Sequence, residues 1–168
     1  MRKTPWLTEA SIIFFELYIN NLLSKKIKPK ILEFGTGAST IWFFNKGTDI
    51  ITVDHDLKWA ETVKKIQPEI DLRLLPRPYH HICNEFAPET FDIVLVDGRD
   101  RVMCVDKSMQ LVKQGGCLIL DNAERSNYTP ALERLKTWTM FTSEQTKPDS
   151  EGFWYPGWKT NWWIKNSD

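Results

Sequence analysis

Three short apolar runs constrain the fold of this chain most. They are "KILEF" at 30–34, "FDIVLVD" at 91–97 and "GCLILDN" at 116–122. A strand that is apolar almost throughout is covered on both faces, which is typical of a parallel sheet flanked by helices. Segments with a helical pattern separate the runs. We therefore expect parallel strands joined by right-handed helical crossovers.

The segments between these runs predict the remaining elements. Helices are expected at 8–25, 38–46, 56–67, 80–86, 101–114 and from Thr129–Pro130 onward, and strands at 30–34, 49–54, 70–76, 91–97, 116–122, 137–142 and 159–165. The last two strands have no helix between them, so they should form an antiparallel hairpin with a long loop, 143–158. The pattern predicts an α/β fold with three layers: a Rossmann-like, seven-stranded, mostly parallel sheet that ends in an antiparallel hairpin, with helices on both faces.

Length and charge exclude several classes of protein. The 168 residues predict one domain, 1–168, with an N-terminal helix in 1–28, a core in 29–125 and a C-terminal helix and hairpin in 126–168. Lys and Arg together number 22, as do Asp and Glu, so no basic excess predicts a nucleic-acid partner. Cys83, Cys104 and Cys117 are scattered, which indicates buried thiols in a cytoplasmic protein. No apolar run reaches the ~18 residues of a membrane span.

A glycine turn follows the first apolar strand and predicts a nucleotide site. It contains Gly35, Gly37 and, at the third position of the dinucleotide fingerprint, Thr40 instead of a glycine. Asp54 follows Gly35 by 19 residues and ends the second predicted strand, where a carboxylate can accept hydrogen bonds from ribose hydroxyls. A tight turn that binds nothing, beside an ordinary strand-end aspartate, is the alternative.

Four segments together resemble the successive motifs of the class I S-adenosylmethionine-dependent methyltransferases. They are "EFGTGAST", "VDHD", "FDIVLVDG" and "KQGGCLILDN", between residues 30 and 125, with Ser39 in place of the family's third glycine. The resemblance implies S-adenosylmethionine as cofactor, and its cationic sulfonium and amino groups suit acidic neighbours. The binding residues implied are Glu33, Gly35, Thr36, Gly37, Ser39, Thr40, Asp54, His55 and Asp97, with 77–81 completing the adenine pocket.

A metal ion is one interpretation of the acidic residues at the ends of the fourth and fifth strands. Asp97, Asp121 and Asn122 are similar to the metal ligands of the catechol and caffeoyl-CoA O-methyltransferases, so Mg²⁺ or Ca²⁺ is considered. A lysine of those enzymes is replaced by Asp100. The alternative is that Asp97 meets the cofactor and Asp121 caps a strand. Candidates for a general base are Asp100 and His81, followed by His80 and Glu124.

The expected activity is methyl transfer to a small molecule, with oxygen as the favoured acceptor atom. Arg99, Arg101 and Arg125 suit an anionic substrate, although surface arginines are common. Trp154, Tyr155 and Trp158 fall in the predicted loop, where they would meet a substrate or a second copy in a homodimer. Two alternatives stay open. One is a binding module for S-adenosylmethionine without activity of its own, and the other is an NAD-dependent oxidoreductase.

Overall fold

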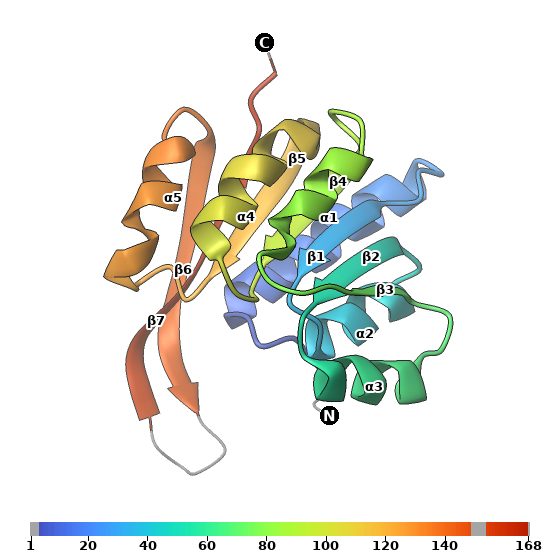
Figure 1. Ribbon diagram of the computed structural model, residues 1–168. Coiled ribbons are helices and arrows are strands. Elements are labelled where there is room, and N and C mark those ends of the chain that lie inside the picture. Colours follow the sequence, from blue (N-terminus) through green and yellow to red (C-terminus); the bar gives the residue numbers. More distant parts are fainter. Residues whose placement is uncertain (1–3, 149–153, 168) are drawn as a thin grey trace.

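The computed structural model describes residues 4–148 and 154–167. Within them, seven strands form one sheet in the order β3-β2-β1-β4-β5-β7-β6 (Figure 1). The strands are β1 (Lys30–Phe34), β2 (Asp49–Asp54), β3 (Asp71–Leu74), β4 (Phe91–Val96), β5 (Val112–Asp121), β6 (Thr139–Pro148) and β7 (Trp154–Ile164). The first five strands are parallel, and β7 pairs antiparallel with both β5 and β6. The predicted fold class is confirmed.

Helices cover both faces of the sheet. In Figure 1, α4 and α5 lie in front of the strands and α1 lies behind them. The elements are α1 (Glu9–Ser24), α2 (Ala38–Asn45), α3 (Leu57–Ile66), η1 (Tyr79–Glu85), α4 (Arg101–Ser108), η2 (Met109–Leu111), η3 (Ser126–Tyr128) and α5 (Thr129–Arg134). The helices η1, η2 and η3 are 3-10 helices, so the helix expected at 80–86 is present in a tighter form.

The two faces of the sheet bury two separate apolar clusters. Side chains alternate between the faces along each strand, so the adjacent residues Trp162 and Trp163 of β7 enter different clusters. Trp163 belongs to the same cluster as Val105 of α4, while Trp162 packs with Phe15 of α1 at a ring-centroid distance of 5.9 Å. The three cysteines are buried and free, as expected. Because both faces of the apolar strands are covered, the carboxyl ends of these strands have fixed positions along one edge of the sheet.

The helix predicted at 101–114 ends earlier than expected. It stops at Ser108, a 3-10 turn follows, and β5 begins at Val112 instead of 116. Val112 already pairs with Phe91 of β4, and the register shifts before the regular pairing resumes at Ile93 and Cys117. The glycines at 115 and 116 therefore accompany an irregularity inside a strand, whereas the sequence pattern suggested a helix end.

The loop predicted at 143–158 is also wrong. Strand β6 continues to Pro148 and β7 begins at Trp154, so most of that segment is hairpin. Pairing between β5 and β7 stops at Asp121 and Thr160. The outer half of the hairpin thus extends past the carboxyl ends of the parallel strands, as Figure 1 shows at the lower left. Trp154 and Tyr155 belong to this strand and not to a loop.

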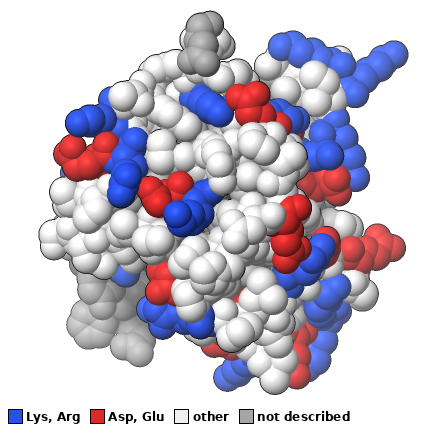
Figure 2. Space-filling model, turned by 45° about the horizontal axis from the view of Figure 1, so that its top comes forward, with Lys and Arg blue, Asp and Glu red and all other residues white. Residues whose placement is uncertain are grey.

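Surface charge is mixed. On the face drawn in Figure 2, Lys and Arg side chains lie among Asp and Glu side chains, in keeping with 22 residues of each sign in the sequence. Among the residues that the structure describes, no helix has the length and apolar character needed to cross a membrane.

Candidate functional site

A cavity of about 710 Å³ opens at the carboxyl ends of β1, β2, β4 and β5. In an open α/β sheet, ligands bind at this edge, near the point where the strand order reverses. Here the reversal lies between β1 and β4, the neighbours at the centre of the sheet. The lining residues are Trp6, Gly35, Thr36, Gly37, Ala38, Ser39, Asp54, His55, Asp56, Trp59, Asp97, Gly98, Arg99, Arg101, Asp121, Asn122 and Arg125.

The glycine turn forms the floor of the cavity through its backbone. Gly35 has φ +100°, and a Cβ at this position would lie 2.6 Å from the backbone nitrogen of Gly98. The turn after β1 thus packs directly against the turn after β4, which only glycine permits. At Gly37 a Cβ would meet no atom within 4 Å. The open space over Gly37 lets a ligand approach the backbone.

Glu33 lies beneath the turn and does not reach the cavity. Its side chain is completely buried and accepts hydrogen bonds from the hydroxyls of Ser39 and Thr40 in the first turn of α2. Burial raises the pKa of Glu33 to about 7, and the two hydroxyl donors oppose that rise. Thr40 also accepts a hydrogen bond of 2.8 Å from the Gly37 N–H and is itself buried. In this structure Glu33 and Thr40 therefore support the turn from below.

Asp54 fixes the turn from the other side. One carboxylate oxygen accepts the N–H of Thr36 at 2.7 Å, and the other accepts the N–H groups of His55 at 2.7 Å and Asp56 at 3.0 Å. The His55 ring lies 3.0 Å from the same carboxylate. Only 7% of Asp54 is exposed, and that part lines the cavity. The carboxylate is thus held in one orientation at the cavity wall.

Arg101 connects the ends of β4 and β5. Its guanidinium donates to the carbonyl oxygens of Asp97 at 2.6 Å, Gly98 at 3.0 Å and Asp121 at 2.5 Å. It also pairs with the Asp97 carboxylate at 3.0 Å and lies 5.3 Å from the centre of the Tyr128 ring. Arg101 is only 7% exposed, which is rare for arginine unless it is paired in this way.

The residues at these strand ends do not fit the divalent metal considered from the sequence. The cationic Arg101 already bridges the two ends where Mg²⁺ or Ca²⁺ would sit between Asp97, Asp121 and Asn122. Asp121 Oδ1 accepts from the Trp158 indole at 3.0 Å and from the Thr160 hydroxyl at 2.8 Å. Among the described residues, no three His, Cys, Asp or Glu side chains are arranged to hold a metal ion.

Solved structures of methyltransferases share this arrangement of strands and helices. An O-methyltransferase of Thermotoga maritima that depends on S-adenosylmethionine is 13% identical with a TM-score of 0.62, covering 100% of this chain and 69% of its own. A Staphylococcus aureus protein provisionally classed as a caffeoyl-CoA O-methyltransferase is 14% identical with a TM-score of 0.68, covering 95% and 85%. The tRNA (m1A58) methyltransferase TrmI of Aquifex aeolicus is 15% identical with a TM-score of 0.64, covering 100% and 73%.

This chain has the class I methyltransferase fold. At 13–15% identity the likeness to these three structures extends to the fold alone. No protein-family model matches the sequence, and no curated protein matches it either.

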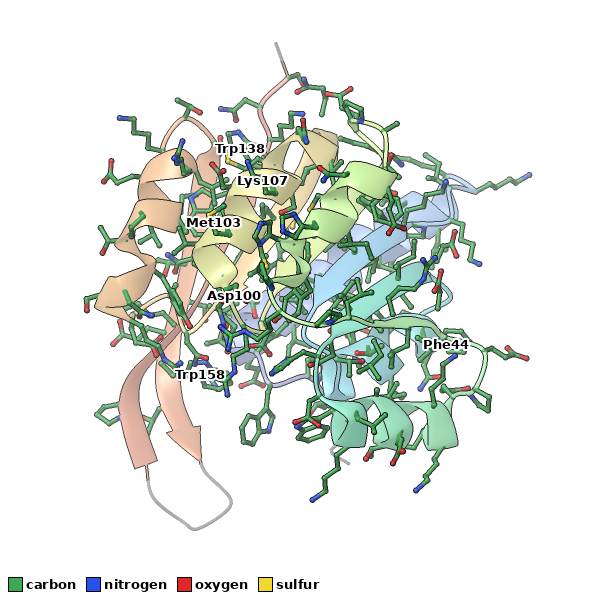
Figure 3. All side chains as sticks on the ribbon, viewed as in Figure 1. Phe44, Asp100, Met103, Lys107, Trp138 and Trp158 are labelled. Atoms are coloured by element: carbon green, nitrogen blue, oxygen red, sulfur yellow. The ribbon has the colours of Figure 1, made fainter. Side chains whose placement is uncertain are left out.

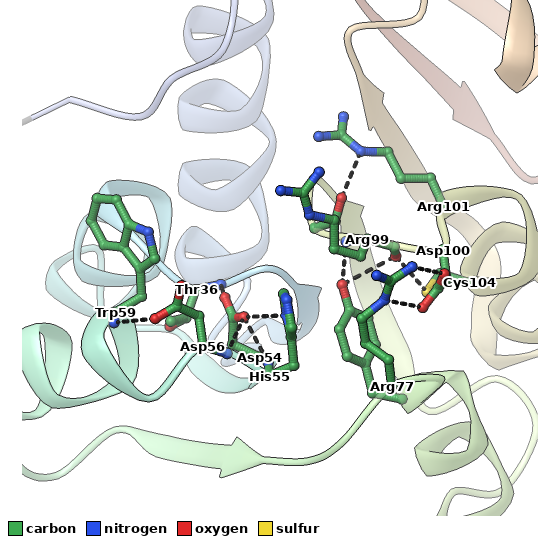
Figure 4. A network of polar contacts seen from close by, with 12 residues as sticks. Thr36, Asp54, His55, Asp56, Trp59, Arg77, Arg99, Asp100, Arg101 and Cys104 are labelled. Atoms are coloured by element: carbon green, nitrogen blue, oxygen red, sulfur yellow. Dashed lines mark hydrogen bonds and ion pairs between the residues drawn. The ribbon is translucent and has the colours of Figure 1, made fainter.

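Two residues considered as general bases have different positions relative to the cavity of this methyltransferase fold. Asp100, at the start of α4, accepts two hydrogen bonds from the Arg77 guanidinium, at 2.9 and 2.5 Å, and this pairing lowers the pKa of Asp100 (Figure 4). A carboxylate with a lowered pKa is a weak base. His81 is exposed on η1 and does not line the cavity. Neither residue lines the cavity of about 710 Å³, and Asp100 lines a smaller one beside it.

The segment 77–81, expected to complete an adenine pocket, also stays outside the large cavity. Arg77 instead lines a smaller cavity of about 350 Å³ next to it. The hydroxyl of Tyr79 donates to the carbonyl of Arg99 at 3.1 Å and accepts the Arg99 N–H. Tyr79 thereby fixes the turn after β4. Its role is to hold the cavity wall rather than to form it.

Trp158 is located on β7 and is buried, with 5% of its surface exposed. Figure 3 shows Trp158 toward the cavity edge of the sheet, with Trp138 and Lys107 toward the opposite edge. Because its indole N–H donates to Asp121, Trp158 joins the hairpin to the end of β5. Trp158 therefore has a structural contact within the sheet, whereas the sequence predicted that it lies in a substrate loop.

The sequence did not identify two tryptophans at the cavity mouth. Trp6, just before α1, is 40% exposed, and Trp59 of α3 is 51% exposed. Thr8 brings the N-terminal segment to this place, because its N–H donates to the Thr160 hydroxyl at 3.0 Å. Asp56 positions Trp59 by accepting its N–H at 3.2 Å. Isolated tryptophans carry no motif, so only the tertiary structure could bring them together here.

Proposed function

We propose that the protein is an S-adenosylmethionine-dependent methyltransferase that acts on an oxygen atom of a small molecule. The observation that carries the proposal is the joint lining of one cavity by the open turn at Gly37 and the carboxylate of Asp54. The cavity, at about 710 Å³, lies within the ~300–1,000 Å³ range of small-ligand sites.

The residues present fit the cofactor. The ribose hydroxyls would donate to the exposed edge of Asp54, whose orientation the backbone amides already fix. The methionine part would lie over Gly37, with its amino group toward Asp97, the side chain of which is 27% exposed. When bound, S-adenosylmethionine supplies a methyl group that its sulfonium has already activated, so the protein mainly has to orient the acceptor.

The acceptor side of the cavity favours oxygen over nitrogen. Arg99, Arg101 and Arg125 line it from the ends of β4 and β5. A nearby cation stabilises the anionic form of a hydroxyl and lowers its pKa, whereas it repels a protonated amine. An acceptor hydroxyl would therefore lose its proton to solvent water more readily here, without a metal ion.

A binding module for S-adenosylmethionine is the second candidate function. The pairing of Asp100 with Arg77 and the exposure of His81 leave the cavity without either predicted base, and this favours a module without activity of its own. The NAD-dependent alternative is weaker, because Thr40 stands at the third fingerprint position and is buried beneath the turn.

Equilibrium binding and a methyl-transfer screen test the proposal together. S-adenosylmethionine should bind and raise the melting temperature, whereas NAD should not, and Gly37→Val should weaken the affinity at least about tenfold by filling the open space. Gly47→Ala, at a glycine with open space outside the cavity, is the control: its positive φ lowers stability, but its affinity for S-adenosylmethionine should stay unchanged.

Labelled methyl groups should then appear on a small molecule when the protein is incubated with a cell extract. Stabilisation by NAD alone would overturn the proposal. Binding of S-adenosylmethionine without any labelled product would favour the binding module.

A further inference from the structure

The two sides of the cavity differ in the partners of their charged side chains. On the β1–β2 side, Asp54 accepts backbone N–H groups and Asp56 accepts the N–H of Trp59. On the β4–β5 side, no described residue pairs with the guanidinium of Arg99, and Arg125 has Glu124 at 3.9 Å. Figure 4 shows Arg99 and Arg101 across the cavity from Asp54 and Trp59. The lining of this side holds three arginines and two carboxylates, those of Asp97 and Asp121, so one positive charge is in excess.

Arg99 combines a fixed backbone with a side chain that can reach a ligand. The backbone of Arg99 is held at both ends, by the hydroxyl of Tyr79 and by Cys104, whose Sγ lies 3.5 Å from the Arg99 carbonyl oxygen. The side chain is exposed and lines both the large and the small cavity. The glutamate near Arg125 already accepts the Lys159 N–H at 2.9 Å through its other oxygen. Both arginines thus retain hydrogen-bond donors for a ligand.

We propose that the methyl acceptor carries a carboxylate or phosphate group, which Arg99 and Arg125 bind. Arginine binds such planar or tetrahedral anions through paired N–H donors. The inference rests on the proposed function and names the substrate class of the same site. Arg101 is not assigned to this group, because its guanidinium is already used by the carbonyls of the strand ends and by the Asp97 carboxylate.

The remaining surface indicates a small acceptor with an apolar body. The smaller cavity, about 350 Å³, adjoins the large one and shares Gly98, Arg99 and Arg101 with it. Val102 and Tyr128 add apolar surface there, and the Asp100 carboxylate, which also lines it, is paired with Arg77. Two arginines, of which Arg99 has no carboxylate partner among the described residues and Arg125 has Glu124 only at 3.9 Å, suit one anionic group, whereas a nucleic acid backbone is bound by an extended basic surface. An aromatic carboxylate has the shape and charge that this space can hold.

Benzoate and inorganic phosphate are suitable probes, and benzamide is the neutral counterpart of benzoate. With the protein saturated by S-adenosylhomocysteine, titration calorimetry should detect benzoate or phosphate and should give at least about tenfold weaker binding of benzamide than of benzoate. The double variant Arg99→Gln with Arg125→Gln should weaken binding of the anion at least about tenfold, since each lost arginine removes a charge-assisted hydrogen bond.

Arg134→Gln is the matched control, because Arg134 is 64% exposed on α5 and lines neither cavity. It should bind the anion as the unmodified protein does. Equal binding of benzoate by the double variant, or equal binding of benzamide and benzoate, would overturn the proposal. Binding of a tRNA but of neither small anion would also overturn it, in favour of a nucleic acid acceptor.

The affinity for S-adenosylhomocysteine is measured separately in each variant and separates the two proposals. Loss of anion binding with the cofactor affinity unchanged supports the anionic acceptor. If S-adenosylhomocysteine fails to bind the unmodified protein, the proposed function fails. An anion that still binds in that case through Arg99 and Arg125 leaves the arginine site itself supported.

Discussion

The two sides of the cavity differ in the groups that hold their charged side chains. On the β1–β2 side, backbone amides and hydroxyls surround Glu33 and Asp54, so carboxylates are held by neutral donors. On the β4–β5 side, a buried guanidinium, Arg101, holds the backbone carbonyls. A cofactor site needs a fixed shape, which neutral donors provide, whereas an acceptor site gains from a charge that acts on the bound group.

The largest effect is expected from removing Arg101. The change Arg101→Gln should lower the free energy of unfolding by about 3–5 kcal/mol, because Asp97 loses its partner and three carbonyl oxygens lose their donor. Arg101→Lys should recover little, since an ammonium cannot reach the three carbonyls at once. Urea denaturation measures both variants. A loss below about 1 kcal/mol would show that Arg101 does not hold the strand ends.

The next effect tests the contact between the turns after β1 and β4. Gly35→Ala should destabilise the fold by about 3 kcal/mol or more, because the methyl group overlaps the backbone of Gly98 and φ is positive. Gly47→Ala also has a positive φ, +79°, but open space, so it should lose only about 1–2 kcal/mol. Equal losses in thermal unfolding would mean that the turns do not need to touch.

A smaller effect, dependent on pH, is expected from Glu33. The folded protein keeps the Glu33 proton up to a pKa of about 7, while the unfolded chain releases it near 4.5. Between these values the folded state binds more protons, so stability falls as pH rises. Glu33→Gln should remove roughly 2–3 kcal/mol of this decline between pH 5 and 8, as measured by denaturation at each pH. The exposed Glu61→Gln should keep the decline, and an unchanged decline in Glu33→Gln would contradict the assignment.

Most of the fold could be predicted from the sequence because apolar runs and glycines mark its elements. The strand at 30–34 and the one ending at Asp54 have the expected bounds. The outer part of β6 could not be predicted, because its sequence, "SEQTK" at 143–147, is polar and has no apolar alternation to mark it as a strand. The start of β5 at Val112 was also missed. It depends on the pairing of Val112 with Phe91 and on a shift in register, which no sequence pattern marks.

The candidate site could be predicted where short motifs carry it and not where tertiary contacts do. The glycine turn and Asp54 line the cavity as expected. The pattern placed Glu33 next to the cofactor, but alternation along β1 turns it under α2. An arginine at a helix start is normally exposed, so nothing in the sequence indicates that Arg101 is buried between two strand ends.

The most direct measurement is a crystal structure of the protein with S-adenosylhomocysteine. We expect the ligand to lie over Gly37, with its ribose hydroxyls on the Asp54 carboxylate and its sulfur facing the side of the cavity that Arg99 lines. A ligand bound elsewhere, or one that makes no contact with the turn at Gly35–Gly37 and with Asp54, would contradict the assignment of this cavity as the cofactor site.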